Sequence, residues 1–384
     1  MKSKSNFLYL AALAFSVCCC SPKGDGSVSE VVVNGNTMTV FTYSALNSNE
    51  ATVPLSSLVE DCYLVQLETH EDAYFNPVYT TVTEKYILIK DGRGEPYKLF
   101  DRSGKFLGAV GAFGGGPENY VISPYDAIVD DENDLIYLAP FIGNNILVYN
   151  TSCQFVKNIT APQQLRCTKI FLFDGTLTAV HMSFPNDKAI AIQFDVNTGE
   201  VLKELAPPAH LIEASGHFGN SELFNTRNVP GIFDILYGGN DTLYHFDVKN
   251  NTFLPVFMLT DNSSEKRWMQ YFQVNKDLIM TWMSGSKLHA TDLKNKLSSN
   301  INVVNDYYGN IPAPMSVIHA RNGYWVHNIQ PEDLMEAIEK RLAESSCTNS
   351  DRQILTKTLS TLKEGANNVV FIGKLKIEVK AKLW

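Results

Sequence analysis

The sequence lacks the local motifs that mark most catalytic and metal sites. Three of its seven cysteines are consecutive, and the other four lie far apart with no C-x-x-C pair: Cys62, Cys153, Cys167 and Cys347. Thiolate metal motifs need close spacing, so we expect no metal and no cofactor. Neither G-x-S-x-G nor H-E-x-x-H occurs, which removes the local signatures of α/β-hydrolases and zinc proteases. These four cysteines could form a disulfide or stay as buried free thiols, and the sequence leaves both alternatives open.

Positive charge is also scarce. The 384 residues include 32 Lys and Arg against 41 Asp and Glu, a net charge of −9. Nucleic acids and anionic membrane surfaces attract clustered basic residues, so neither is an expected partner. Copies of a chain with this net negative charge repel each other, so we expect a monomer.

The longest apolar run near the N-terminus, from Phe7 to Val17, is shorter than the ~20 residues of a membrane span. It follows Lys2 and Lys4 and leads directly into Cys18, Cys19 and Cys20, a pattern typical of a bacterial lipoprotein signal peptide at 1–20. Cys20 fits lipidation best, since Val17 then stands three residues before the cut, although Cys18 and Cys19 stay open. Residues 21–40 would form a tether.

A repeat runs through the rest of the chain. Strand-like segments end in Asp or Asn followed by a polar turn, at Asp101, Asn150, Asp195, Asp247 and Asp292, with spacings of 49, 45, 52 and 45 residues. Asp and Asn favour turns because their side chains accept hydrogen bonds from the backbone just ahead. A period of ~40–50 residues with several short strands predicts β-propeller blades.

The ends of the chain predict a sixth blade. An N-terminal strand at 62–67 would pair with a C-terminal strand at 369–372 and leave no free edge. Before the latter, two helical patterns form an insert at about 331–365, the second with an apparent capping box at 350–353. The predicted fold is therefore all-β, a six-bladed propeller over 41–384.

The glycine-rich run Gly111–Tyr120 interrupts this pattern between the first two periods. It ends Gly116-Pro117-Glu118, whereas a phosphate loop needs Lys and Ser or Thr after its last glycine. We interpret the run as the link from the first blade to the second.

The same run carries a family resemblance. Gly111-x-x-Gly-Gly-Gly-Pro117-Glu118-x-Tyr120, with Pro124, Asp130 and Tyr149-Asn150, resembles the 6-bladed β-propeller lipoprotein family of Bacteroidetes, related to NHL-type repeats. The end of the chain, from Leu362 to Lys376, resembles that family's closing motif, with Asn368 in place of its usual proline. The resemblance implies the fold and an anchor in the outer membrane, facing the periplasm or the surface, but no activity.

Candidate site residues are therefore polar or aromatic side chains near predicted inner-strand starts: Arg93, Tyr125, Asp126, Arg227, Trp268, Trp282 and Trp325. Aromatic faces suit sugar stacking, although a propeller Trp is more commonly core. His319 and His327 flank an Asn322-Gly323 hairpin, whose register predicts that they point to opposite faces and share no ion. The acidic run 130–134 lacks the glycine and distal glutamate of a calcium loop.

We therefore expect a lipid-anchored binding or scaffold module of the cell envelope, whose partner is a glycan, a peptide or an envelope protein. The alternative is a hydrolase or lyase acting on a carbohydrate or lactone, with its site assembled in the channel from several blades.

Overall fold

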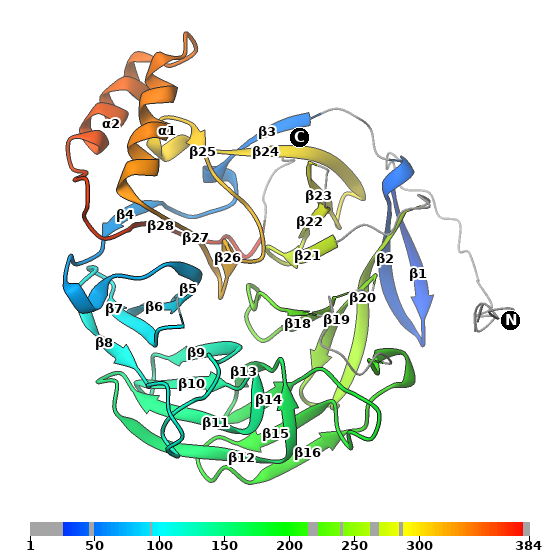
Figure 1. Cartoon of the computed structure of the whole chain (residues 1–384). Helices are drawn as coiled ribbons and strands as arrows, with labels where there is room; N and C mark the ends of the chain where they lie inside the picture. The colour runs from blue at the N-terminus through cyan, green and yellow to red at the C-terminus, as the bar shows by residue number, and fades with distance from the viewer. Residues whose placement is uncertain are drawn as a thin grey trace, which may run out of the picture.

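The computed structural model describes residues 26–45, 50–92, 94–213, 222–238, 241–261, 269–283 and 287–378. Six sheets, each built around antiparallel strands, are arranged around a central axis as the blades of a propeller, as the sequence predicts (Figure 1). The Asp or Asn of each repeated turn is the last residue of the third strand in its blade, which explains the period.

The first three blades are regular four-stranded sheets. Blade 1 comprises β5 (Pro77–Val82), β6 (Tyr86–Asp91), β7 (Tyr97–Asp101) and β8 (Phe106–Val110). Blade 2 comprises β9 (Asp126–Asp130), β10 (Leu135–Ala139), β11 (Ile142–Asn150) and β12 (Phe155–Arg166). Blade 3 comprises β13 (Lys169–Phe173), β14 (Thr176–Val180), β15 (Ala191–Asp195) and β16 (Val201–Leu205).

The other three blades take in strands from elsewhere in the chain. Blade 4 comprises β17 (Leu223–Phe224), β18 (Phe233–Tyr237), β19 (Thr242–Asp247) and β20 (Thr252–Thr260). Blade 5 comprises β21 (Met269–Gln273), β22 (Leu278–Met283), β23 (Leu288–Asp292), β24 (Leu297–Asn305) and β25 (Ile311–Pro312). Blade 6 comprises β26 (Ala320–Arg321), β27 (Tyr324–Ile329), β28 (Val369–Lys374) and β4 (Tyr63–Gln66).

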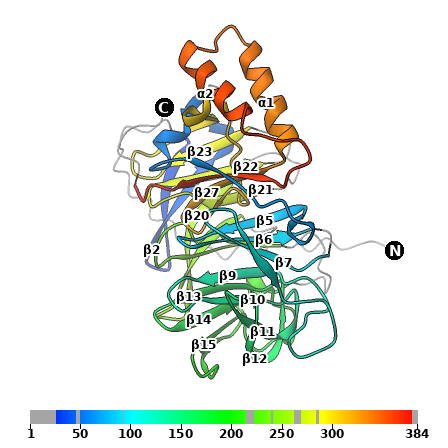
Figure 2. The same ribbon diagram turned by 90° about the vertical axis from the view of Figure 1, so that its left-hand side faces the viewer.

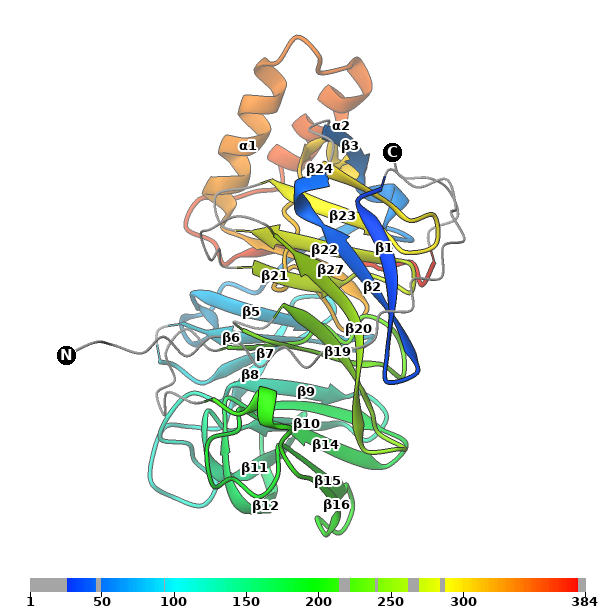
Figure 3. The same cartoon turned by 90° about the vertical axis from the view of Figure 1, so that its right-hand side faces the viewer.

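The N-terminal segment contributes strands to the outer edges of blades 4, 5 and 6 in turn, and we call its described residues 28–45 and 50–66 the strap. β2 (Asn36–Thr42) pairs in parallel with β20, β3 (Glu50–Pro54) pairs in parallel with β24, and β4 pairs antiparallel with β28. The last pairing confirms the predicted closure of the ring. β1 (Val28–Val33) folds back on β2, which lies between it and β20 (Figure 3).

The predicted tether at 21–40 is wrong for its second half. Asn34 and Gly35 both have positive φ and turn the chain tightly between β1 and β2, the geometry that an Asn-Gly hairpin needs. Met38, Val40 and Phe41 are then buried, so this segment belongs to the folded body. The predicted signal peptide and Cys20 lie outside the described residues.

The helical insert lies between β27 and β28, where the sequence placed it, and projects beyond the ring of blades (Figure 2). It contains α1 (Pro331–Ala343) and α2 (Asn349–Leu359). The predicted capping box at 350–353 is displaced: Thr348 caps α2, reciprocally with Asp351, because Thr348 has the extended backbone of a cap. No described helix has the length and apolar character needed to cross a bilayer.

Short 3-10 turns occupy the loops: η1 (Tyr43–Ala45), η2 (Leu55–Ser57), η3 (Glu71–Ala73), η4 (Ala209–Leu211) and η5 (Asp306–Tyr308). The glycine-rich run joins β8 to β9, as predicted, and a bridge from Phe113 to Tyr120 closes it into a loop.

Apolar side chains fill the spaces between neighbouring blades. Ile87 of blade 1 packs in one cluster with Val326 of blade 6, and Leu99 packs with Ile136 of blade 2 in another. The four cysteines of the described part are free thiols. Because the blades bury apolar side chains against each other, the polar ends of their inner strands are left to face the axis.

Candidate functional site

A single arginine closes the centre of the propeller. Arg227, in the loop after β17, donates from Nη1 to Asp126 Oδ2 at 2.6 Å and to the Ile170 carbonyl at 2.7 Å. Its Nε donates to Asn322 Oδ1 at 2.9 Å, and its Nη2 reaches the Ala127 carbonyl at 3.3 Å. One side chain of blade 4 therefore joins blades 2, 3 and 6 across the axis.

The backbone around Arg227 is fixed by a buried carboxylate. Asp234 accepts hydrogen bonds from the backbone N–H groups of Thr226 and Arg227, at 2.9 and 2.6 Å for the shorter contacts. Arg227 has φ of 56°, a left-handed conformation that costs a non-glycine residue about 1 kcal/mol or more and needs such support. Next to it, Asn228 donates to the carbonyls of Gln273 and Ala320, which belong to blades 5 and 6.

Asp126 is the carboxylate partner at the start of β9. Besides Arg227, it accepts hydrogen bonds from Arg321 Nη2 at 3.0 Å and from the Ile170 backbone N–H at 3.1 Å. Burial alone raises the pKa of this carboxyl, but Arg227, Lys169 and Arg321 more than offset that effect and hold the pKa well below its usual range. Asp126 is thus a permanent anion that cannot donate a proton at neutral pH.

Three further cations surround one aromatic ring near the starts of the inner strands. The ring of Tyr79 has Arg321 Cζ at 4.7 Å, Lys169 Nζ at 5.6 Å and Lys90 Nζ at 6.0 Å from its centroid. The Lys169 ammonium also lies 4.5 Å from the ring centroid of Tyr125. Burial lowers the pKa of Lys169 to about 7 and that of Lys90 to about 8. We call Tyr79, Lys90, Tyr125, Lys169 and Arg321 the cation cluster.

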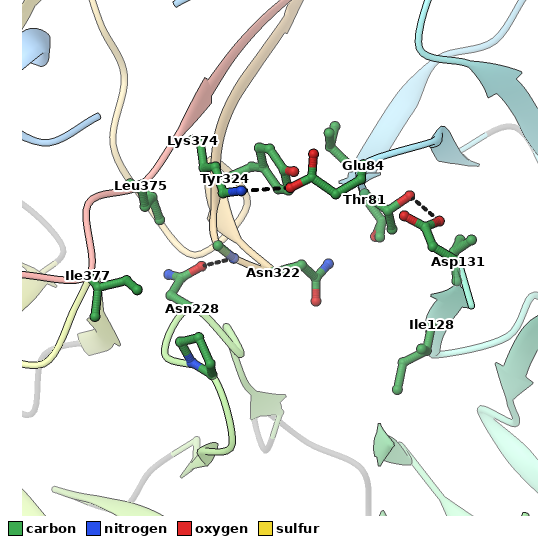
Figure 4. A pocket seen from close by; sticks show the side chains of 15 residues that line it. Thr81, Glu84, Ile128, Asp131, Asn228, Asn322, Tyr324, Lys374, Leu375 and Ile377 are labelled. Atoms are coloured by element: carbon green, nitrogen blue, oxygen red, sulfur yellow. Dashed lines mark hydrogen bonds and ion pairs between the residues drawn. The ribbon is translucent and has the colours of Figure 1, made fainter. Parts of the chain in front are cut away.

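A cavity of about 380 Å³ opens at the other ends of the inner strands (Figure 4). Its walls come from the first turns of blades 1 and 6, from the end of β9 and from the segments after β17 and β28. It combines apolar surface with carboxylates, amides and an ammonium, from Thr81, Val82, Thr83, Glu84, Ile128, Val129, Asp131, Asn228, Pro230, Asn322, Gly323, Tyr324, Lys374, Leu375 and Ile377.

The cavity's charged groups are held in place by their neighbours. Lys374 Nζ donates to Glu84 Oε1 at 2.7 Å, and this bond lowers the pKa of Glu84. Asp131 accepts from the Thr83 hydroxyl at 2.7 Å. Asn322 gives its oxygen to Arg227, while its buried Nδ2 has no partner among the described residues. An N–H donor with no partner beside a cavity is suited to a ligand oxygen.

Of the residues predicted from sequence, Asp126 and Arg227 pair at the axis, and Tyr125, directly before Asp126, contacts Lys169. Trp325 instead lies in β27, fully buried, with Nε1 donating to the Pro314 carbonyl at 3.0 Å, so it has no exposed face for a sugar. Trp282 is in β22, the second strand of blade 5. Arg93 and Trp268 lie outside the described residues.

Sequence reasoning missed Tyr79, Lys90, Lys169, Arg321 and the cavity residues. A weak signal exists for two of them, since Lys169 opens an otherwise apolar strand and Arg321 stands directly before the Asn322-Gly323 turn. A charged side chain at the start of an inner strand faces the axis, but nothing in one sequence says which such residues meet.

The expected separation of His319 and His327 is wrong. The two-residue turn and its register are as predicted, with Ala320 opposite Trp325, yet the rings lie 5.9 Å apart. His319 precedes β26 in a turn in which its N–H donates to the Ser316 carbonyl, and its Nδ1 lies 2.8 Å from Ser316 Oγ, so the strand alternation does not apply to it. The described residues contain no group of three or more metal ligands.

Comparison with solved structures supports the fold through the first of the three matches below. A Bacteroides fragilis protein described as exported matches with a TM-score of 0.57 at 13% identity, covering 85% of this chain and 100% of the other. A DUF4221 member from Bacteroides vulgatus matches with a TM-score of 0.46 at 11% identity, covering 86% and 99%. The extracellular domain of a Bacteroides thetaiotaomicron protein described as a hybrid two-component system matches with a TM-score of 0.39 at 13% identity, covering 62% of this chain and 29% of the other.

No curated protein sequence gives a significant match. A family model described as a domain of unknown function, DUF4934, matches residues 38–374, which spans the propeller from β2 to the end of β28. The chain therefore belongs to the DUF4934 family.

Proposed function

We propose that this protein is a non-enzymatic binding module of the cell envelope, and that its ligand is a neutral glycan held in the cavity at the channel mouth. The observation that carries the proposal is the cavity itself. It has about 380 Å³ beside an axis closed by Arg227, within the range of ~300–1,000 Å³ typical of small-molecule sites.

The polar groups of the cavity suit sugar hydroxyls. Each hydroxyl both donates and accepts, so a sugar site needs acceptors and donors side by side. Glu84 and Asp131 supply acceptors, and the Lys374 ammonium supplies donors beyond the one that it gives to Glu84. Ile128 and Pro230 add apolar surface for the ring carbons. A glycan is therefore favoured over the peptide or envelope-protein partners that the sequence left open.

The carboxylates do not favour the alternative of a hydrolase or lyase. Glycoside hydrolysis needs one carboxylic acid with a raised pKa to protonate the leaving group. Lys374 lowers the pKa of Glu84, so this group stays ionised at neutral pH. Asp126 is likewise held ionised by its two arginines. Both serve as acceptors and not as proton donors.

The location in the envelope belongs to the same proposal. It rests on the lipoprotein-like start of the sequence and on the fold likeness to a Bacteroides fragilis protein described as exported. Cys20→Ala should move the protein from the membrane fraction to the soluble fraction, whereas Cys153→Ala should leave it membrane-bound. Retention of the Cys20→Ala variant on the membrane would show that another residue or mechanism anchors it.

The binding site is tested by a glycan array followed by titration calorimetry with the best ligand. Glu84→Gln should weaken binding at least tenfold, because it removes the charge of an acceptor. The matched control Glu339→Gln removes the same charge from an exposed position on α1 and should change nothing. Equal affinity of both variants, or no saturable binding to any glycan, would refute the proposed site.

A further inference from the structure

The cation cluster carries more positive than negative charge, and the proposed glycan site gives no role to this excess. Tyr79, Tyr125 and Lys169 stand at the starts of the inner strands of blades 1, 2 and 3, Lys90 lies opposite Tyr79 at the end of β6, and Arg321 ends β26. The cavity is lined mainly by the ends of the inner strands of blades 1 and 2 and by the segments after β17, β26 and β28. The cluster therefore lies toward the other mouth of the channel. A ligand bound at the cluster would occupy a different place from the proposed glycan, although Arg227 and Asp126 connect the two sites.

The carboxylate in direct contact with this cluster is already engaged. Asp126 pairs with Arg227 at 2.6 Å and with Arg321 at 3.0 Å, so one negative charge faces two guanidinium groups before Lys90 and Lys169 are considered. Glu222, which is exposed, contributes to the electrostatic surroundings of Tyr79 and Tyr125, but no described ion pair joins it to these cations. The described buried groups thus carry excess positive charge.

Two donors in the cluster have no acceptor among the described residues. The Lys169 side chain makes no hydrogen bond to any described residue, although the residue is only 3% exposed. Arg321 is also 3% exposed, and its Nε has no partner in the described part of the chain. The buried Arg321 Nε donor is costly, since neither water nor protein replaces its lost hydration.

We propose that the cation cluster is a binding site for a carboxylate monoanion, which accepts hydrogen bonds from Lys169 Nζ and Arg321 Nε. The flat rings of Tyr79 and Tyr125 flank Lys169, which suits a planar group. A phosphate dianion needs more donors than an ammonium and a single guanidinium N–H provide. Tyr79, Lys90 and Tyr125, which surround Lys169 and Arg321, are only partly buried.

Binding should be coupled to proton uptake. In the free protein the pKa of Lys169 is about 7, with Lys90, Arg227 and Arg321 opposing its charge and Asp126 supporting it. Tyr79, Tyr125, Cys167 and Glu222 also border the site. A bound carboxylate stabilises the ammonium and raises that pKa. Affinity should therefore fall as the pH rises above about 7, and proton uptake should be largest at pH 8.

Titration calorimetry with sodium acetate, sodium glucuronate and uncharged glucose tests the inference. Saturable acetate and glucuronate binding indicates a site for any small carboxylate, and glucuronate alone indicates an acidic sugar. Lys169→Met should weaken binding at least tenfold and abolish proton uptake, measured in two buffers of different ionisation enthalpy. The control Lys340→Met removes an exposed ammonium on α1 and should change neither.

A second variant covers the case in which Lys169→Met does not fold. Arg321→Lys keeps the charge and should weaken carboxylate binding while Lys169 remains, because the Nε donor is lost. The inference is overturned if neither carboxylate binds saturably, if glucose binds equally well, or if both variants bind carboxylates like the wild type. Loss of glycan binding in Glu84→Gln has no bearing on these outcomes, so the two sites are tested separately.

Discussion

Arg227 and Asp126, 101 positions apart in the chain, form a buried ion pair at 2.6 Å on the axis of the propeller. Their side chains are 5% and 2% exposed, so solvent screens the pair little. Because Arg227 also binds blades 3 and 6, this contact positions the inner ends of four blades. It fixes the geometry on which both candidate sites depend.

Removing one partner of this pair should destabilise the whole propeller. Arg227→Met removes one of the two guanidinium groups that offset the negative charge of the buried Asp126 carboxylate. We therefore expect a loss of about 3–5 kcal/mol in the free energy of unfolding, measured by urea denaturation. Lys287→Met breaks an exposed ion pair with Glu50 and should cost at most about 1 kcal/mol. Equal losses in the two variants would mean that the axial pair is not a structural centre.

The strap should contribute strongly to stability through Phe41. This side chain is fully buried with residues of blades 4 and 5, and Phe41→Ala should cost about 3–5 kcal/mol. Val32→Ala, at a position 65% exposed on the outer strand β1, should change little. If Phe41→Ala unfolds at the same urea concentration as the wild type, residues 28–42 are a tether after all.

The glycine-rich link offers a matched pair of substitutions. Gly111 has φ of +75°, and a Cβ there would meet the Tyr120 ring at 2.6 Å, so Gly111→Ala should destabilise the fold by about 1–3 kcal/mol. Gly115 has no neighbouring atom within 4 Å, and Gly115→Ala should be neutral or slightly stabilising. The reverse order in thermal unfolding would contradict the role of Gly111.

The histidine pair should make stability depend on pH. Burial lowers the pKa of His319 and of His327 to about 4 each, below an unfolded value of about 6.5. Between these values the unfolded chain binds more protons, so the free energy of unfolding should fall as the pH is lowered from 6.5 toward 4. Stacking on Phe371 would survive in His327→Phe.

Between pH 7 and pH 4.5, the free energy of unfolding of His327→Phe should therefore fall by about 1–3 kcal/mol less than that of the wild type. His70→Gln, at an exposed position, is the control and should keep the wild-type slope. An unchanged slope in His327→Phe would show that His327 is not a neutral, buried group in the fold.

The architecture was predictable because its signals are local and repeated. Each Asp- or Asn-headed turn ends a third strand, and the helical insert has its own apolar periodicity. The hairpin of β1 and β2 was missed although Asn34-Gly35 follows a run of valines, a hairpin pattern that a tether would not need. The closing pair Asp126 and Arg227 carries no local signal, since only the curvature of the ring brings distant strand ends together.

The cavity was unpredictable for the same reason. Glu84, Asn322 and Lys374 belong to separate turns and to a strand end, and each alone has the composition of an ordinary polar loop. Their convergence depends on the order of the blades and on the closure of the ring by β4, which no single segment encodes.

Hydrogen exchange in the presence of the tightest glycan from the array would locate the binding site directly. We predict slower amide exchange in the turns that form the cavity, at residues 83–85 and 322–324, with no change in the helical insert at 331–359. Protection confined to the insert, or to the exposed outer edges of blades 1 to 3, would contradict a binding site at the channel mouth.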